Sequence, residues 1–124
     1  MAHNTSARNY TAGGAIAPYR IVKPGAADGE VVQAAAATDF LMGVCESVGP
    51  ASGERCDIVK SGIADVEFAG VVARGEPVTA DADGKGVKAA PAAGANARII
   101  GFAEVTTAAG DIAPVLLAPG VMQG

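Results

Sequence analysis

The chain has 124 residues, half of them hydrophobic, and its nine basic and 13 acidic side chains give a formal net charge of −4. A chain of this length can bury one modest core but not two independent ones. The acidic balance, without a dense Lys/Arg cluster, argues against nucleic-acid binding, and no apolar run is long enough to span a membrane. We therefore expect one domain with no nucleic-acid and no membrane partner.

The composition predicts a mainly β fold. Among the hydrophobic residues, 28 are Ala, 21 are Val or Ile and only three are Leu. Branched side chains suit a pleated sheet and lose rotamer freedom in helices, so this excess of Val and Ile over Leu favours strands. The 17 Gly and seven Pro supply the turns that such a fold needs.

Residues 1–14, MAHNTSARNYTAGG, predict an extended N-terminal arm. The segment is polar, has no apolar period and ends in a Gly pair. It carries Arg8 and no carboxylate, whereas the rest of the chain holds all 13 acidic residues. We expect the arm to be dispensable for folding and free to order on a neighbouring subunit, with the β domain spanning residues 15–124.

The β domain is predicted to contain two runs of strands. In the first run, Pro24-Gly25, Asp28-Gly29 and the turn from Gly49 to Gly53 separate strands at about 16–22, 30–36, 40–47 and 54–60. In the second run the strands are expected at 63–73, 77–80, 86–90, 97–105 and 112–118. The Ala-rich stretch at 33–39 leaves a short helix open on propensity alone.

The two runs repeat each other. Residues 40–62 read FLMGVCESVGPASGERCDIVKSG and residues 98–120 read RIIGFAEVTTAAGDIAPVLLAPG. A nearly constant offset matches Val22 with Val78, Gly29 with Gly84, Val32 with Val87, Gly43 with Gly101, Glu46 with Glu104 and Gly53 with Gly110. We expect two similar halves, about 15–62 and 63–120, that bury their apolar faces against each other in a small β-sandwich or barrel.

The sequence offers few residues for histidine or cysteine chemistry. His3 is the single histidine and lies in the arm, so no His-based acid/base pair or triad can be assembled. Cys45 and Cys56 flank the turn from Gly49 to Gly53, which makes a disulfide conceivable. Production in a cytosol, expected because the amino terminus lacks a secretory hydrophobic segment, favours thiols.

The acidic residues offer two further candidates. The turn Asp81-Ala82-Asp83-Gly84 resembles the centre of a calcium loop, but Thr79 and Ala90 occupy the places of its anchoring carboxylates, which favours a plain β-turn. Glu46 and Glu104 hold matching places, and paired carboxylates can act as acid and base. Without a partner histidine they are interpreted as exposed strand positions or contacts between subunits, and we expect no enzyme, metal or cofactor.

Four glycines are predicted to be structural, Gly43, Gly84, Gly101 and Gly110. Gly84 and Gly110 lie in expected turns, whereas Gly43 and Gly101 interrupt strong apolar runs. A glycine inside a strand marks a sharp bend or a close approach of another backbone. We expect Gly101 to occupy such a place.

The second half resembles a known protein family. GEPVTADADGKGVKAA (75–90), followed by RIIGFAEVTTAAGDIAPVLL (98–117), is similar to the capsid decoration, or cement, proteins of tailed bacteriophages. IVKPG (21–25) and GVCESV (43–48) fit the family more loosely. The matching positions are turn glycines and apolar residues, namely Gly75, Pro77, Val78, Gly84, Val87, Ile100, Gly101, Ala103 and Gly110.

This resemblance implies a β-tulip-like structural protein without enzymatic activity. Such a protein binds the outer surface of a phage head, contacts the major capsid protein and often forms a homotrimer. It would be made in the cytoplasm of the host bacterium and end on the virion. The expected capsid contacts are four arm residues, Asn4, Arg8, Asn9 and Tyr10. The alternative, a small β-barrel module that binds a ligand or carbohydrate, needs a concave site with aromatics, and aromatic residues make up only 4% of the chain.

Overall fold

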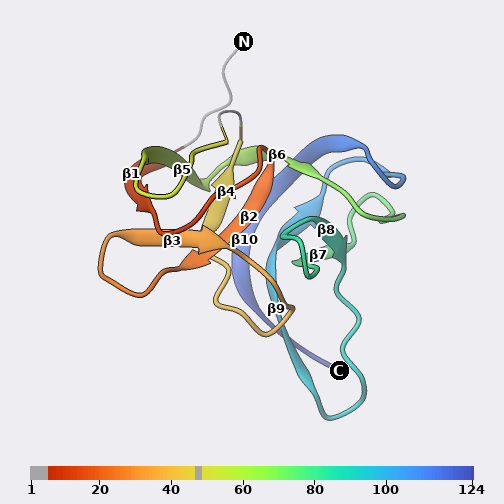
Figure 1. The fold of residues 1–124 in the computed structure, drawn as a ribbon. Coiled ribbons are helices and arrows are strands. Elements are labelled where there is room, and N and C mark those ends of the chain that lie inside the picture. Colours follow the sequence, from red (N-terminus) through yellow and green to blue (C-terminus); the bar gives the residue numbers. More distant parts are fainter. Residues whose placement is uncertain (1–5, 47–48) are drawn as a thin grey trace.

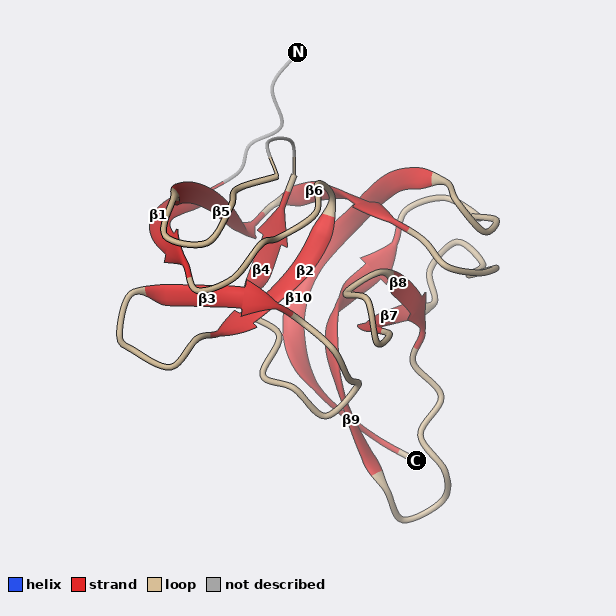
Figure 2. Ribbon diagram, in the orientation of Figure 1, coloured by secondary structure: helices blue, strands red, loops and turns tan. Residues whose placement is uncertain are grey.

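The computed structural model describes residues 6–46 and 49–124, which form ten strands joined by turns and loops (Figures 1 and 2). None of these residues lies in a helix, and accordingly no helix there could cross a membrane. The strands are β1 (Ser6–Ala12), β2 (Arg20–Pro24), β3 (Glu30–Gln33), β4 (Gly43–Cys45), β5 (Arg55–Ser61), β6 (Ile63–Glu67), β7 (Pro77–Ala80), β8 (Gly86–Lys88), β9 (Asn96–Ala103) and β10 (Ile112–Gln123).

The first half of the chain is a closed barrel with the strand order β1-β3-β2-β4-β5. It closes because β1 pairs with β5 in antiparallel fashion and, through Thr11 and Ala12, with β3 in parallel. The interior is filled by alternate residues of these strands together with one loop residue. They are Tyr10, Ala12, Ile16, Val22, Val31, Cys45, Cys56 and Ile58. The predicted mainly β fold, a small sandwich or barrel, is confirmed.

The second half is a sheet with the order β6-β10-β9-β7-β8. Its two ends approach each other, because Phe68, just after β6, makes a parallel bridge to Gly86 at the start of β8. This bridge corresponds to the parallel pair of Ala12 and Val31 in the first half. The second half therefore curls almost into a barrel of the same design.

The strand register shows that the two halves correspond residue by residue. Val22 pairs with Gly43 in the first half, and Val78 pairs with Gly101 in the second. The hairpin β2–β3 corresponds to β7–β8, β4 to β9 and β5 to β10. Each half also has a first strand, β1 or β6, that pairs with its last strand. The repeating unit thus begins at β1.

The expectation of an arm over residues 1–14 is wrong for Ser6–Ala12, which is strand β1 of the barrel. Tyr10 and Ala12 point inward and are buried, while Asn9 and Thr11, which alternate with them, are satisfied by polar partners on β5. Only two of the seven residues reach the core, so the apolar period was too short to signal a strand. Residues 1–5, including His3 and Asn4, lie outside the described part of the chain.

The Ala-rich stretch after β3 forms a turn and not a helix. Asp39 accepts hydrogen bonds from the backbone N–H of Ala35 (2.8 Å) and Ala36 (3.0 Å), and Lys23 pairs with the same carboxylate at 3.2 Å. Side-chain bonds of this kind offer the backbone an alternative to helical pairing. The strand expected over 30–36 therefore ends at Gln33.

The two halves share one core. Ile21, Val44 and Val59 point out of the first barrel and pack in the same cluster as residues from inside the second half, such as Val66 and Val115. β6 contacts β2 and β4, and β10 contacts β5. In Figure 1 the halves lie side by side, with β10 passing between them. A shared core makes the protein one folding unit.

Candidate interaction surfaces

Three of the four expected contact residues lie on β1. Arg8 and Asn9 are exposed, whereas Tyr10 points into the first barrel and is only 7% exposed. The Tyr10 hydroxyl accepts a hydrogen bond from Lys60 Nζ at 2.8 Å, and the charged groups of Lys60 and Arg8 lie 5.3 and 5.7 Å from the ring centre. Tyr10 is therefore a core residue at the mouth of the barrel, with two cations over it.

The polar side chains of β1 and β5 form a network on the barrel surface. Asn9 Nδ2 donates to Asp57 Oδ1 at 3.0 Å, and Arg55 donates to Asn9 Oδ1 and, at 3.1 Å, to the Thr11 hydroxyl. Because each side chain holds its neighbour, this face presents a fixed pattern of donors and acceptors to a partner.

A hollow of about 350 Å³ lies beside this network, lined by Asn9, Cys45, Glu46, Arg55, Cys56, Asp57 and Val59. Both cysteines are buried thiols. Burial, with Cys56 nearby, raises the pKa of Cys45 to about 11, and burial also raises the pKa of Cys56. Thiols held protonated in this way are poor nucleophiles. The lining also contains no aromatic side chain for stacking a sugar or base.

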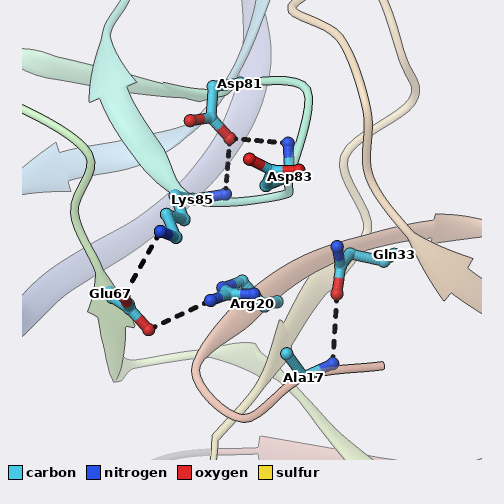
Figure 3. A network of polar contacts seen from close by, with 7 residues as sticks. All are labelled: Ala17, Arg20, Gln33, Glu67, Asp81, Asp83 and Lys85. Atoms are coloured by element: carbon cyan, nitrogen blue, oxygen red, sulfur yellow. Dashed lines mark hydrogen bonds and ion pairs between the residues drawn. The ribbon is translucent and has the colours of Figure 1, made fainter. Parts of the chain in front are cut away.

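The turn between β7 and β8 is bound to the first half, as Figure 3 shows. Glu67 at the end of β6 pairs with Arg20 of β2 at 3.1 Å and with Lys85 of the turn at 3.5 Å. The backbone N–H of Ile21 donates to the Gly84 carbonyl at 2.9 Å. These contacts connect three segments across the boundary between the halves.

The acidic residues of this turn support its fold. Asp81 Oδ1 accepts hydrogen bonds from the backbone N–H groups of Asp83 and Lys85, both at 2.9 Å (Figure 3). This is an Asx-type turn that needs no cation. Within residues 6–46 and 49–124, no three His, Cys, Asp or Glu side chains are grouped to hold a metal.

The two matching glutamates have different roles. Glu46 Oε2 accepts a hydrogen bond from the backbone N–H of Asp65 at 2.7 Å, so it ties the first half to β6. Glu104 is exposed just after β9, where its own N–H donates to the Pro114 carbonyl at 3.1 Å. The structure thus places one of them at the internal junction and the other on the surface.

The four predicted glycines divide into two kinds. At Gly43 and Gly101 a Cβ would overlap the backbone of the neighbouring strand, at the Val59 and Leu116 carbonyls. Gly84 and Gly110 have positive φ angles of 72° and 89°. Gly84 also lies close to the first half, because a Cβ there would be 2.8 Å from Gln33 Cγ.

The outer face of the second sheet carries an apolar row that sequence reasoning missed. Ile63 pairs with Leu116, Leu116 with Phe102, and Phe102 with Pro77, so these four side chains cross the sheet on one face. Leu116 is 45% and Phe102 37% exposed. The sequence held a signal for this row in the alternation of side chains along β10. Ile112 and Leu116 are an even number of residues apart, so both face away from the core.

Comparisons with known proteins show the fold. Neither protein-family profiles nor curated proteins match this sequence. Among solved structures, the chain is similar to the N base of the head fibre gp8.5 of bacteriophage phi29, with a TM-score of 0.67 and 16% identity. The likeness covers 92% of this chain and 94% of that one. At this identity it establishes a shared all-β fold over nearly the whole length.

Proposed function

We propose that the protein is a structural component of a tailed-phage head that binds the outer capsid surface and stabilises contacts between major capsid protein subunits. The observation that carries this proposal is the fold shared with the base of a phage head fibre over 92% of the chain. The resemblance of residues 75–117 to capsid decoration proteins supports the same role independently.

The construction of the molecule suits such a role. Its two halves share a core and are tied together by Arg20, Glu67 and Lys85, so the unit can transmit force without opening. A head packed with genome is strengthened by many copies of a rigid clamp, because each bound copy stabilises the assembled state alone. With several attachment points per copy, weak single contacts suffice.

The contact surface is proposed to include the exposed β1 residues Arg8 and Asn9. Asn9 is held on the barrel by Asp57 and Arg55, which add donors and acceptors to its face, and Arg8 lies over the Tyr10 ring. Asn4 stays a predicted contact outside the described residues. We also propose a homotrimer on the head, and a role that requires neither catalysis nor a cofactor.

A binding experiment with purified capsids tests the proposal. Expanded heads lacking the protein are incubated with increasing amounts of it and sedimented, and bound chain is quantified. We expect saturable binding that Arg8→Glu weakens, while Arg74→Glu, an exposed site in the second half, leaves it unchanged. Absence of saturable binding by the intact chain would overturn the proposal, and equal binding by both variants would remove Arg8 from the contact.

A further inference from the structure

The open apolar row of the second half has a buried counterpart in the first half. Its register equivalents are cross-strand partners in the same way, Ala7 with Val59, Val59 with Val44, and Val44 with Ile21. Ile21 and Val44 are fully buried and Val59 is 8% exposed, because the second half covers them. The same face of the repeating unit is thus covered once and open once.

Strand β6 forms a main part of that cover. It contacts the first half through its unpaired edge. Glu67 N–H donates to the Tyr19 carbonyl at 2.9 Å, and Asp65 N–H donates to Glu46 Oε2 at 2.7 Å. The internal junction therefore combines the apolar row with two acceptors beside it, which receive the outward N–H groups of one strand.

Both acceptor positions recur beside the open row. Gly75 corresponds to Tyr19, and the two share positive φ angles of 87° and 62°. Glu104 corresponds to Glu46 and is exposed. The open face of the second half thus carries the apolar row and a carboxylate at positions equivalent to those that bind β6 in the first half.

The counterpart of β6 is β1, and its edge is open. Within the described part of the chain, only Thr11 and Ala12 of β1 pair with β3, and Ser6–Tyr10 pairs with β5 alone. Thr11 N–H points away from β5, to the Gly29 carbonyl at 2.9 Å. Because N–H directions alternate along a strand, Asn9 N–H points the same way, as Asp65 N–H does in β6. An open edge of this kind is a template for pairing.

The charges of the two surfaces complement each other. Arg8 is exposed on the open strand, while Asp65 and Glu104 lie next to the open row. None of the three is in an ion pair with another described residue. Opposite charges on two surfaces speed encounter and favour one register of docking.

We propose that copies of this chain associate head to tail, the β1 edge of one copy docking on the Ile63–Leu116–Phe102–Pro77 row of the next. The contact repeats the internal junction between the halves. A head-to-tail contact closes into a ring when its rotation allows, as the proposed homotrimer requires. Two bonds of the internal junction cannot recur, so this contact is weaker than the internal one. Pro77 replaces Ile21 and has no N–H to give, and Thr11, the counterpart of Glu67, already donates its N–H to the Gly29 carbonyl of its own copy.

Purified protein without capsids tests this interface, so failure here is distinct from failure of capsid attachment. Sedimentation over a concentration series should show self-association that Phe102→Asp weakens by about tenfold or more. Val121→Asp, at a 59% exposed site further along β10, is the matched control and should have no effect. On β1, Asn9→Pro removes the outward N–H and should weaken association, whereas Asn9→Ala, which loses the same side chain, should not.

Cross-linking tests the head-to-tail direction. Asn9→Cys and Glu104→Cys proteins should form a disulfide-linked dimer only when mixed, because each contact joins unlike positions. Both changes are on exposed side chains, so this test does not depend on a buried substitution. A chain that stays monomeric at all concentrations, or a cross-link within either variant alone, would overturn the proposal. Association that persists unchanged in folded Phe102→Asp and Asn9→Pro proteins would also do so.

Discussion

Gly101 sets the spacing between β9 and β10. It pairs with Leu117, and a Cβ at this position would overlap the carbonyl of Leu116. Its backbone does not have a positive φ, so the demand is for space alone. Gly43 has the same role in the first half, facing the Val59 carbonyl. Both halves thus use one missing side chain to bring two strands into contact.

Replacing Gly101 should therefore destabilise the fold. We expect Gly101→Val to lower the free energy of unfolding by about 3 kcal/mol, because β10 must move to admit the side chain. Gly70→Ala is the control, since a Cβ there meets nothing within 4 Å and its φ is not positive. Denaturant unfolding measures the free energy of unfolding of both variants. Equal stability would show that β10 can move to admit the valine side chain without loss of stability.

The buried thiols predict a dependence on pH. The folded pKa of Cys45 is about 11, above its ordinary value of 9.0, because burial disfavours the thiolate. A raised folded pKa contributes stability that is complete below about pH 9 and is lost as the pH rises toward 11. We expect stability to decline over this window, and to decline less in Cys45→Ala.

Alkylation checks the thiols directly. Native protein at neutral pH should react slowly with iodoacetamide, and unfolded protein prepared without reductant should gain two adducts, one each on Cys45 and Cys56. Intact mass gives the count. Unfolded protein without adducts would mean that the cysteines are joined.

At the scale of elements, strands with a strong apolar period were predictable and β1 was not. The expected strands at 77–80 and 97–105 agree with β7 and β9 because their Val and Ile residues face a core. β1 has a polar surface, and its pairing partners are on β5, far along the chain. The repeat held the missing signal, since Asn9 and Gly14 match Asp65 and Gly70 at the offset that matches Val22 with Val78.

The surfaces were less predictable than the strands. Arg8, Asn9 and Tyr10 were predicted to contact the capsid. Arg8 and Asn9 are exposed, but Tyr10 is in the core. The apolar row depends on the pairing of β6, β10, β9 and β7, and sequence alone does not give that register. Glu46 and Glu104 look alike in sequence and differ because only one of them meets the other half of the chain.

Deleting residues 2–12 should strongly destabilise the protein, contrary to the expectation for a dispensable arm. The deletion removes β1, opens the barrel between β3 and β5, and takes Tyr10 and Ala12 from the core. Loss of the Tyr10 ring alone should cost about 3 to 5 kcal/mol. Deletion of residues 2–5, which leaves β1 whole, is the control. Thermal unfolding compares them, and an unchanged midpoint for the longer deletion would contradict the barrel.

At the scale of the molecule, Glu67 connects the halves. Its carboxylate pairs with Arg20, whose side chain is 13% exposed and whose buried Nε has no hydrogen-bond partner among the described residues. Glu67→Gln would leave this guanidinium without its carboxylate, and we expect a loss of about 1 to 2 kcal/mol. Glu76→Gln, which breaks the more exposed pair with Lys88, should cost less. Equal losses of stability in the two variants would show that the Arg20–Glu67 ion pair at the junction contributes no more than a surface pair.

Electron microscopy of the phage particle tests whether the protein binds the outside of the head. Heads should be imaged from particles with the protein and from particles lacking it, and the two maps subtracted. Difference density is expected on the outer capsid surface, fitted by the barrel and the second sheet as one rigid unit, with the exposed β1 side chains facing major capsid protein. Identical maps, or density confined to the head interior, would contradict binding to the outside of the head.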